Sequence, residues 1–437
     1  MDGPTPLYRI VRDATGVSTD TRTLRPGQVF FALSGPNFDA NRFVQQALEA
    51  GAAHAVASDP SLAGDERITV VDDVLTTLQA VASEHRATLT LPVIGITGSN
   101  GKTTTKELIH SVLSQRFRTY ATRGNLNNHI GVPLSLLEVS NDDHDIAIIE
   151  MGASAVGEIA SYCRWARPTH GMITNIGKAH IEGFGGVEGI IRGKTELYAA
   201  LAERRGTVFV RHDDDLLMDK AQVVGSRFTF GTNSTADLSA DCLEVSPFVT
   251  LRLGDEVIET RLIGRYNVAN ALAAAAFGRF FGLTDAEIKT GLEAYVPANN
   301  RSQTIEVGHH LIVLDAYNAN PTSMEAGLDH LASIDRPARW AVLGDMFELG
   351  ETEDDEHAAI CRLVDAAPAM TGILCGERFA RHADAFPDHH VFATTREAAD
   401  WLDTQPAPEP SAVLIKGSRS MRMEDVLPAV RSWLERS

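Results

Sequence analysis

The chain is 437 residues long, carries a formal net charge of −19, and contains 44% hydrophobic and 22% charged residues. This composition is typical of globular proteins, and the length calls for about two to four domains, of which we favour three. A strongly acidic chain lacks the basic face that binds a phosphate backbone, which argues against a nucleic-acid partner.

No targeting or membrane-spanning segment is evident in the sequence. No run approaches the roughly 18 apolar residues of a membrane span, and Met1 to Pro6 lack the basic start and apolar stretch of a secretory signal. Cys163, Cys242, Cys361 and Cys375 form no C-x-x-C pair, which is typical of buried thiols in a reducing compartment. We expect a cytoplasmic protein without a membrane span, and a monomer.

Strands and helices alternate along the first two thirds of the chain. Residues 1–88 mix short strands with helical stretches at 41–51 and 73–88, which predicts a small α/β domain. In residues 89–298 strands precede helices, at 91–97 then 103–116, 145–151 then 156–165, and 171–176 then 187–202. These strands are almost continuously apolar, so they predict a parallel sheet covered on both faces. Residues 206–263 predict an antiparallel annex, and an Ala-rich helix follows from Asn267 to Phe281.

The last third restarts the alternation after residues 295–301, whose sequence Tyr-Val-Pro-Ala-Asn-Asn-Arg is typical of a hinge. Strands are predicted at 311–315, 339–344, 371–376, 389–393 and 411–416, and helices at 321–332, 354–366, 377–386, 395–402 and 423–435. This pattern predicts a second doubly wound α/β domain over residues 299–437.

Residues 97–105 read Thr-Gly-Ser-Asn-Gly-Lys-Thr-Thr-Thr between a predicted strand and a predicted helix. Backbone N–H groups of such a loop cradle phosphate, while Lys102 can reach the terminal phosphates and the Thr103 hydroxyl can hold Mg²⁺. The spacing departs from G-x-x-x-x-G-K-[ST], because Ile96 stands at the first glycine position. A glycine-rich turn with an incidental lysine is the alternative. We predict that the chain binds and splits a nucleoside triphosphate.

Two further polar residues follow predicted strands. Glu150 ends the strand at 145–150, and His180 follows the next strand. Because ligands bind at the carboxyl ends of parallel strands, Glu150 can hold a metal near the phosphates, and His180 lies at the same edge. The alternatives are a solvated strand-end glutamate and a structural histidine.

Lys194 lies on the predicted helix from Val187 to Leu201, three or four residues from members of its apolar stripe (Ile190, Ile191, Leu197, Tyr198, Leu201). This spacing predicts that Lys194 points inward. A buried lysine without a partner loses its proton, and a neutral amine reacts with carbon dioxide to give a carbamate, an anionic metal ligand. A lysine that reaches solvent from the edge of the stripe is the alternative.

Polar residues also close three predicted strands of the last domain, at 315–321, 344–346 and 416–419. Because these strand ends meet at one edge of the sheet, they can face the glycine loop across a cleft. The sequence therefore predicts a nucleotide and substrate site between domains.

These motifs together make the chain resemble the Mur ligases of peptidoglycan synthesis, over nearly its whole length. The segments that carry the resemblance are 97–104, Gly-Asn-Leu-Asn-Asn-His-Ile-Gly-Val-Pro at 124–133, 150–152, 179–184, 194–196, Asn267 with Asn270, 315–321 and 416–419. The resemblance implies a three-domain α/β architecture, with a UDP-substrate domain at 1–88, a central P-loop domain at 89–298 and a Rossmann-like domain at 299–437.

The resemblance also implies an activity, the ATP-dependent addition of D-alanyl-D-alanine to UDP-N-acetylmuramoyl-tripeptide through an acyl phosphate. It implies ATP and two Mg²⁺ ions, and it assigns roles to residues of this chain. Lys102, Glu150, His180 and Lys194 are implied to be catalytic, with Lys194 carbamylated; Thr103, Glu150, His180 and Lys194 are implied to bind metal.

Further residues are assigned by the same resemblance. ATP contacts are implied for Gly98, Ser99, Asn100, Gly101, Lys102, Thr103, Thr104, Asn125, Asn267, Asn270, Arg301 and Asp315. Contacts to the other substrates are implied for Ser18, Asp20, Thr21, Arg22, Asn41, Asn127, Asn128, Tyr317, Asn318, Asn320, Lys416, Ser418 and Arg419.

The chain departs from the family pattern at Asn41 and Tyr266, where histidine is usual, and at Ala316, where a second acidic residue is common. Two alternatives stay open within the superfamily, a diaminopimelate-adding ligase, whose Asp-Asn-Pro-Arg stretch is absent here, and a folylpolyglutamate synthase. A non-catalytic ATP-binding module is a third alternative, although it gives Lys194 no reason to face inward.

Overall fold

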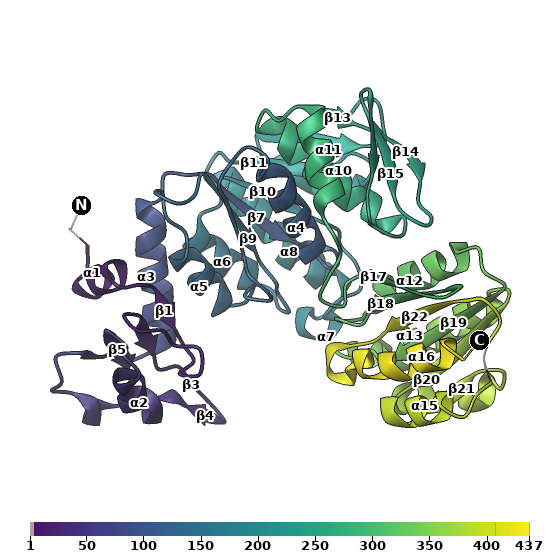
Figure 1. The fold of residues 1–437 in the computed structure, drawn as a ribbon. Coiled ribbons are helices and arrows are strands. Elements are labelled where there is room, and N and C mark those ends of the chain that lie inside the picture. Colours follow the sequence, from purple (N-terminus) through teal and green to yellow (C-terminus); the bar gives the residue numbers. More distant parts are fainter. Residues whose placement is uncertain (1–3, 407, 437) are drawn as a thin grey trace.

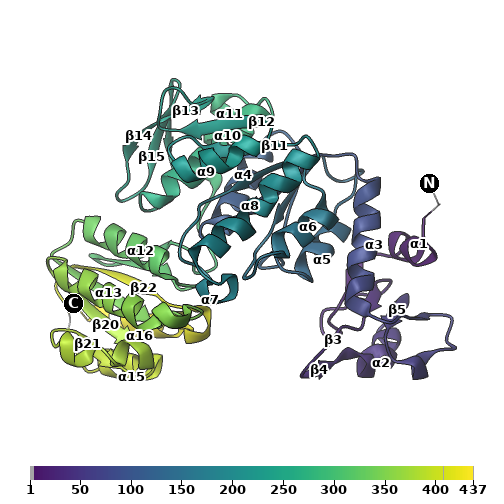
Figure 2. The ribbon, with the colours of Figure 1, turned by 180° about the vertical axis from the view of Figure 1, so that it is seen from behind.

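The computed structural model describes residues 4–406 and 408–436. Three units, each built on its own sheet, follow one another along the chain, and the central unit lies between the other two in both views (Figures 1 and 2). The predicted lack of a secretory signal rests partly on residues 1–3, which lie outside the described residues.

The N-terminal unit has a four-stranded parallel sheet in the order β1-β2-β5-β6, with a β3-β4 hairpin beside it. Its strands are β1 (Val17–Ser18), β2 (Val29–Phe31), β3 (Ser34–Gly35), β4 (Phe38–Asp39), β5 (His54–Ala57) and β6 (Ile68–Val70), and its helices are α1 (Pro6–Asp13), α2 (Val44–Glu49) and α3 (Val74–Thr88). Helix α3 is capped by Asp73, whose carboxylate accepts a hydrogen bond from the Thr76 N–H. It contacts α1 of its own unit as well as α5 and α6 of the central unit, so it joins the two units.

The central unit has seven parallel strands in the order β13-β12-β11-β10-β7-β9-β8, which confirms the predicted parallel sheet. They are β7 (Val93–Thr97), β8 (Thr119–Ala121), β9 (Ile146–Glu150), β10 (His170–Ile173), β11 (Thr207–Arg211), β12 (Ser226–Gly231) and β13 (Leu238–Ser239). An antiparallel annex is present, but it spans only β14 (Asp241–Glu244), β15 (Thr250–Leu253) and β16 (Glu256–Glu259). The prediction was wrong for residues 206–239, because α9 (Asp215–Lys220) connects β11 to β12 as a crossover between parallel strands.

Helices cover both faces of the central sheet. Successive residues of β7 point to opposite faces, so Ile94 and Ile96 pack in one core with α4 (Lys102–Leu113), α10 (Tyr266–Phe280) and α11 (Asp285–Ala294). Val93 packs in the other core with α5 (Gly131–Leu137), α6 (Glu158–Ala166) and α8 (Val187–Glu203). The short α7 (Ile181–Phe184) precedes α8 and lies on the side of the central unit that faces the C-terminal unit (Figure 1).

The C-terminal unit has six strands in the order β17-β18-β22-β19-β20-β21. Its strands are β17 (Gln303–Val307), β18 (His310–Asp315), β19 (Ala338–Gly344), β20 (Met370–Cys375), β21 (His390–Phe392) and β22 (Ser411–Lys416), and its helices are α12 (Pro321–Ser333), α13 (Glu353–Ala366), α14 (Glu377–Ala380), α15 (Thr395–Leu402) and α16 (Leu427–Leu434). The prediction of parallel strands with alternating helices is confirmed for β18 to β22. It missed β17, an antiparallel edge strand joined to β18 by a tight turn.

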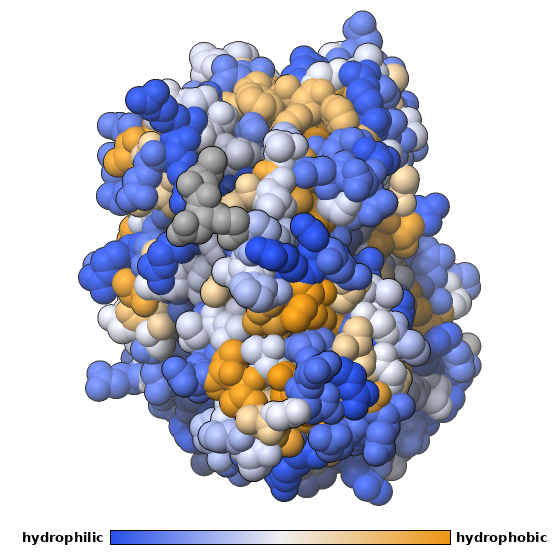
Figure 3. Space-filling view, turned by 90° about the vertical axis from the view of Figure 1, so that its left-hand side faces the viewer, coloured by the Kyte–Doolittle hydropathy of each residue, from blue (hydrophilic) through white to orange (hydrophobic). Residues whose placement is uncertain are grey.

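On the side of the molecule where the N-terminal unit lies, polar side chains cover most of the surface, and apolar patches lie between them (Figure 3). Among residues 4–406 and 408–436, no helix combines the length and apolarity that a membrane crossing requires.

Candidate active site

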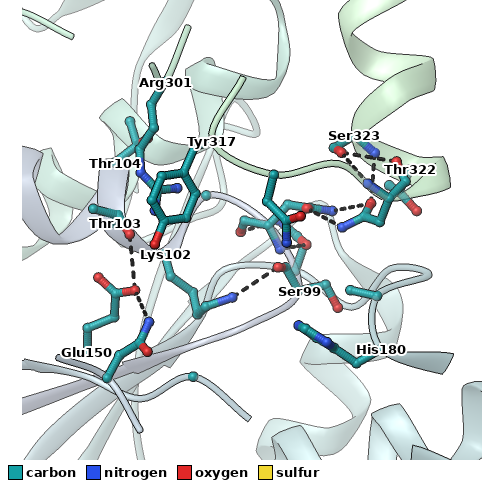
Figure 4. A pocket seen from close by; sticks show the side chains of 18 of the residues that line it. Ser99, Lys102, Thr103, Thr104, Glu150, His180, Arg301, Tyr317, Thr322 and Ser323 are labelled. Carbon is teal, nitrogen blue, oxygen red and sulfur yellow. Dashed lines mark hydrogen bonds between the residues drawn. The ribbon is translucent and has the colours of Figure 1, made fainter. Parts of the chain in front are cut away.

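A cavity of about 510 Å³ lies between the central and C-terminal units. The central unit contributes the glycine loop and the residues that follow β9 and β10, and the C-terminal unit contributes residues just before β17, residues at and after the end of β18, and the last residue of β22 (Figure 4). The predicted cleft between domains is therefore present, with the ends of β18 and β22 on the cavity. The third predicted strand end, residues 344–346, does not line it, because Asp345 is buried and accepts hydrogen bonds from the N–H groups of Arg378 (3.0 Å) and Phe379 (3.1 Å).

The glycine loop joins β7 to α4, and its glycines are required by geometry. Gly98 has φ +142°, and a Cβ there would lie 2.0 Å from the Thr174 hydroxyl oxygen. Lys102, the first residue of α4, folds back and donates hydrogen bonds from Nζ to the carbonyls of Gly98 (2.8 Å) and Ser99 (3.0 Å). Burial lowers the pKa of Lys102 to about 8, against an opposing effect of the Glu150 carboxylate. A phosphate group entering the loop would give this ammonium an anionic partner.

Glu150 ends β9 and is only 1% exposed. Its Oε1 accepts hydrogen bonds from the Thr103 hydroxyl (3.0 Å) and the Asn127 amide (2.8 Å). Its Oε2 is buried and has no hydrogen-bond partner among the residues that the structure describes. Because a buried carboxylate oxygen without a donor is costly, this atom suits a bound cation.

Lys106 is a charged residue of this region that the sequence analysis missed. It is fully buried, and its Nζ lies 2.8 Å from Glu107 Oε1 and 3.8 Å from Glu150 Oε2. The sequence could have indicated this position, because Lys106 follows Lys102 by one helical turn and therefore lies on the same face of α4.

His180 connects the two sides of the cleft. It has φ +55°, and its Nδ1 pairs with the Glu348 carboxylate of the C-terminal unit. The nearby Lys178 pairs with Glu356, which adds a second ion pair between the units. Burial lowers the pKa of His180, and Glu348 opposes that shift. Within the described part of the chain, no three His, Cys, Asp or Glu side chains converge as a ready metal site.

Lys194 is buried, as predicted, with 1% of its surface exposed. Its Nζ donates to the Ala153 carbonyl (2.9 Å) and lies 4.9 Å from the centre of the Phe184 ring. Burial, followed by the positive charge of Lys102, lowers its pKa well below the usual value. Lys194 thus lies directly behind Ala153, which lines the cavity.

On the C-terminal side the charged groups are already paired. Asp315 forms an ion pair with Lys416 and accepts a hydrogen bond from the Ser302 N–H (2.9 Å). The Arg301 guanidinium lies 3.5 Å from the centre of the Tyr317 ring, where cation–π attraction orients it.

Amide side chains complete the lining. Asn320 caps α12 and donates to the Asn100 side chain across the cleft (2.8 Å). On α10, Asn270 donates to Asn267 (2.8 Å) and accepts from the Thr105 hydroxyl (3.0 Å). These contacts tie the glycine loop to both α10 and the C-terminal unit.

Comparison with known proteins places the chain in a family. Residues 96–278 match the Mur ligase middle domain, and residues 300–419 match the Mur ligase glutamate ligase domain. The UDP-N-acetylmuramoyl-tripeptide--D-alanyl-D-alanine ligase of Bacillus subtilis is 35% identical over 94% of this chain and 92% of its own length. The chain belongs to the Mur ligase family.

Solved structures agree with this assignment. A crystal structure of MurF from Acinetobacter baumannii superimposes with a TM-score of 0.87 at 32% identity, covering 98% of both chains. MurF ligase from Thermotoga maritima, crystallised in complex with ADP, gives a TM-score of 0.84 at 27% identity over 99% of this chain and 100% of its own. The family resemblance inferred from the sequence is confirmed.

Most predicted ATP-site residues of this Mur ligase line the cavity. The predicted site residues that line it are Ser99, Asn100, Gly101, Lys102, Thr103, Thr104, Asn127, Asn128, Glu150, His180, Asn267, Asn270, Arg301, Asp315, Tyr317, Asn318, Asn320 and Lys416. Lining residues that the sequence analysis missed include His129, Ser154, Glu158, Asn175, Ser302, Thr322 and Ser323. Several of these residues are next to predicted site residues in the sequence, so their position beside a motif could have indicated that they line the cavity.

Other predicted residues do not line this cavity. They are Gly98, Asn125, Lys194, Ser18, Asp20, Thr21, Arg22, Asn41, Ser418 and Arg419. Ser18 to Arg22 and Asn41 lie in the N-terminal unit, where Arg22 pairs with Asp20. The Asn41 amide donates to Asp39 (2.8 Å) and Ser58 (3.1 Å), and Arg419 pairs with Glu424 (2.7 Å). The roles assigned to these residues stay predictions.

Proposed function

We propose that this Mur ligase joins D-alanyl-D-alanine to UDP-N-acetylmuramoyl-tripeptide at the expense of ATP, in peptidoglycan precursor synthesis. The observation that carries the proposal is the cavity where the glycine loop and Glu150 face Arg301 and Asp315 of the other unit. The similarity to ligases of that name, and to a MurF that binds ADP, supports it.

The proposed reaction has two steps. The terminal carboxylate of the tripeptide attacks the γ-phosphorus of ATP, the bond to the β-phosphate oxygen breaks, and ADP leaves an acyl phosphate. The dipeptide amine then attacks the acyl carbon, phosphate leaves, and the amine loses a proton to give the amide. No side chain needs to form a covalent bond, so the protein acts by positioning and by charge stabilisation.

Charge is the main obstacle, because a carboxylate must approach a polyphosphate in an acidic protein. The glycine loop and Lys102 bind the phosphates, and Asn125 lies on the γ-phosphate side. Asn267 and Asn270 contact the adenine, Asp315 the ribose, and Arg301 the nucleotide after closure. These assignments are supported for most of the residues by their position on the cavity.

The residues present fit Mg²⁺, since Glu150 has a buried Oε2 without a donor beside the Thr103 hydroxyl. Thr103 and Glu150 would hold a first ion, and Glu150, His180 and carbamylated Lys194 a second. When bound, the ions offset phosphate charge as the carboxylate approaches. The protein itself orients Glu150 through the hydrogen bond that the Asn127 amide donates to it.

Carbamylation of Lys194 is supported by its burial and by the absence of an ion-pair partner among the described residues. In this modification the Nζ lone pair attacks carbon dioxide, an N–C bond forms, and a proton leaves. The product carries negative charge at a position one residue layer behind the cavity wall.

The other substrates are assigned to residues of the N-terminal unit and of the cleft. Ser18, Asp20, Thr21, Arg22 and Asn41 would receive UDP, with Asn127 and Asn128 towards the tripeptide. Tyr317, Asn318, Asn320, Lys416, Ser418 and Arg419 would receive the dipeptide. We divide the chain into domains at 1–88, 89–298 and 299–437, and we place it in the cytoplasm as a monomer.

One assay tests the proposal. Phosphate release should require UDP-N-acetylmuramoyl-tripeptide, and amide product should require D-alanyl-D-alanine, in a panel of muramyl peptides and dipeptides. Equal phosphate release with ATP alone would contradict the ligase assignment. Turnover with diaminopimelate or glutamate as the incoming amine would favour another ligase of the superfamily, and ATP binding without turnover would favour a regulatory module.

A further inference from the structure

A second cavity, of about 480 Å³, lies at the opposite end of the central sheet and shares no lining residue with the cleft. His170, at the start of β10, lines this rear cavity, whereas Asn175, just past the end of β10, lines the cleft. Five residues of extended chain separate the two sites by roughly 16 Å. The helices α3, α6 and α8, which lie side by side (Figure 2), all end at the rear cavity.

Arginines dominate the rear cavity. Arg86, Arg167, Arg204 and Arg205 line it, and no Asp or Glu side chain does. None of the four forms an ion pair within residues 4–406 and 408–436, although the chain as a whole carries a net charge of −19. An acidic protein that leaves four neighbouring guanidinium groups without a carboxylate has concentrated positive charge in one place.

Arg86 forms the floor of the cavity and is 7% exposed. Its guanidinium donates to the carbonyls of Ala166 (2.7 Å), Leu89 (2.9 Å) and Arg167 (3.0 Å). Burial, and then the positive charges of Arg167 and Arg204, lower its pKa to about 10. The geometry of Arg86 is thus fixed by neutral acceptors, which leave its charge uncompensated.

Two of the arginines occupy backbone positions that favour glycine. Helix α8 ends in a Schellman motif, in which Gly206 N–H bonds to Leu201 (2.8 Å) and Arg205 N–H to Ala202 (3.2 Å), and Arg205 has φ +55°. Helix α6 ends with Arg167 at φ +42°, its N–H bonded to Cys163 (3.0 Å). A side chain in this left-handed conformation costs free energy that glycine would avoid, so glycine at 167 and 205 would be the more stable choice for the backbone alone.

Helix capping alone does not account for the cluster. The C-termini of α3, α6 and α8 carry about half a negative charge each, which makes roughly −1.5 in all. The four arginines carry four full positive charges. A net positive charge of more than two therefore stays in the cavity. We propose that this rear cavity is a second ligand site, which takes a small phosphorylated anion.

The phosphate class follows from the shape and chemistry of the site. Guanidinium groups present forked N–H donors that match phosphate oxygens, and weakly hydrated arginine suits this role better than lysine. A volume of about 480 Å³ exceeds the space that one phosphate needs, so the site has room for a pyrophosphate or for a phosphate ester with its organic group.

The test measures pyrophosphate binding by calorimetry, without divalent metal and at constant ionic strength. Because the glycine loop also binds phosphate, the Lys102→Ala variant is the background. Adding Arg204→Ser and Arg205→Ser should weaken the remaining binding by about tenfold or more, since two charge-assisted contacts are lost. The matched control adds Arg261→Ser and Arg431→Ser, which remove two exposed arginines elsewhere and should leave binding unchanged. Equal weakening in both pairs, or no binding in the background, would overturn the proposal.

A single variant separates binding from a structural role. Arg205→Gly removes one guanidinium and relieves the positive φ, so its Tm should equal or exceed that of the wild type while pyrophosphate binds several-fold more weakly. Unchanged binding would overturn the proposal. Ribose 5-phosphate, measured in parallel, identifies the source of the anion: tighter binding than pyrophosphate indicates a phosphate ester, and weaker binding an inorganic anion.

Discussion

Two lysines on the central side of the cleft are held by backbone carbonyls, whereas the lysine on the C-terminal side is held in an ion pair. Among the described residues, Lys102 and Lys194 form no ion pair and donate to carbonyl oxygens, and Glu150 Oε2 accepts no hydrogen bond, with the Lys106 ammonium 3.8 Å away. Asp315, by contrast, pairs with Lys416. The central side therefore gains most from binding a charged ligand, and the C-terminal side is suited to positioning and closure.

The strongest test of this difference between the two sides removes the C-terminal unit altogether. A fragment of residues 1–298 lacks Arg301, Asp315 and Lys416, so it should bind ATP poorly and give no amide product. Binding is measured by calorimetry and turnover by phosphate release, and circular dichroism checks that the fragment keeps its secondary structure. Full activity of a folded fragment would contradict the closure of the C-terminal unit over ATP.

Loss of Lys194 should nearly abolish turnover, because it removes the proposed anionic metal ligand from the central side. In Lys194→Ala, added short carboxylates such as acetate should restore part of the activity by occupying the vacated space. Lys289→Ala, on α11, is the matched control and should show neither loss nor rescue. An active Lys194→Ala enzyme, or an unmodified ammonium in a metal-loaded crystal, would contradict the carbamate.

Lys102→Ala and Glu150→Ala should each lower kcat by about two orders of magnitude or more, the usual effect of removing a preorganised electrostatic group. Steady-state kinetics at saturating Mg²⁺ measures the effect. The exposed Glu188→Ala is a control for loss of a carboxylate. Near-normal turnover in either variant would show that the residue has no role in charge stabilisation.

A smaller effect is expected at the contact that joins the two sides. Among the described residues the Asn100 side chain bonds only to Asn320, so Asn100→Ala removes this link (2.8 Å) and about 0.5 to 1.5 kcal/mol. We expect KM for ATP to rise about two- to tenfold with kcat nearly unchanged. Asn320→Ser breaks the same link while retaining a helix-capping side chain, so it should raise KM for ATP by the same factor, whatever its effect on the dipeptide. A fall in kcat instead would place Asn100 in the chemical step.

How much the sequence predicts also differs between regions. The glycine loop, Glu150 and the inward position of Lys194 could be predicted, because each depends on local spacing along one strand or helix. The course of residues 206–239 could not, since short β-rich segments fit a parallel or an antiparallel arrangement equally well. The ion pairs of His180 with Glu348 and of Lys178 with Glu356 join residues more than 160 positions apart, which no local pattern encodes.

The rear arginines illustrate the same limit. Arg86, Arg167 and Arg204 are scattered in the sequence, and only the packing of α3, α6 and α8 brings them together. Single arginines near helix ends are common, so the sequence carries no signal for a cluster.

The last prediction concerns stability rather than activity, on the C-terminal side at His330 of α12, where no effect on turnover at neutral pH is expected. Both ring nitrogens are buried and find no hydrogen-bond partner in residues 4–406 and 408–436, and burial lowers the pKa of His330 to about 4. A histidine with a lowered pKa binds its proton more readily in the unfolded chain, so stability is full above the ordinary pKa and is lost as pH falls from about 6.5 to about 4. The loss at the lower end is up to roughly 3 kcal/mol.

His330→Leu should therefore make the unfolding of this unit less sensitive to acid. Trp340, Trp401 and Trp433, three of the four tryptophans, lie in the C-terminal unit, so tryptophan fluorescence reports mainly on its unfolding. Between pH 7 and pH 4.5, the Tm measured in this way should fall less in His330→Leu than in the wild type. The control is His309→Leu, which removes an exposed imidazole and should leave the acid sensitivity of the Tm as in the wild type. Parallel Tm profiles for His330→Leu and the wild type would show that His330 takes up no proton on unfolding in this range.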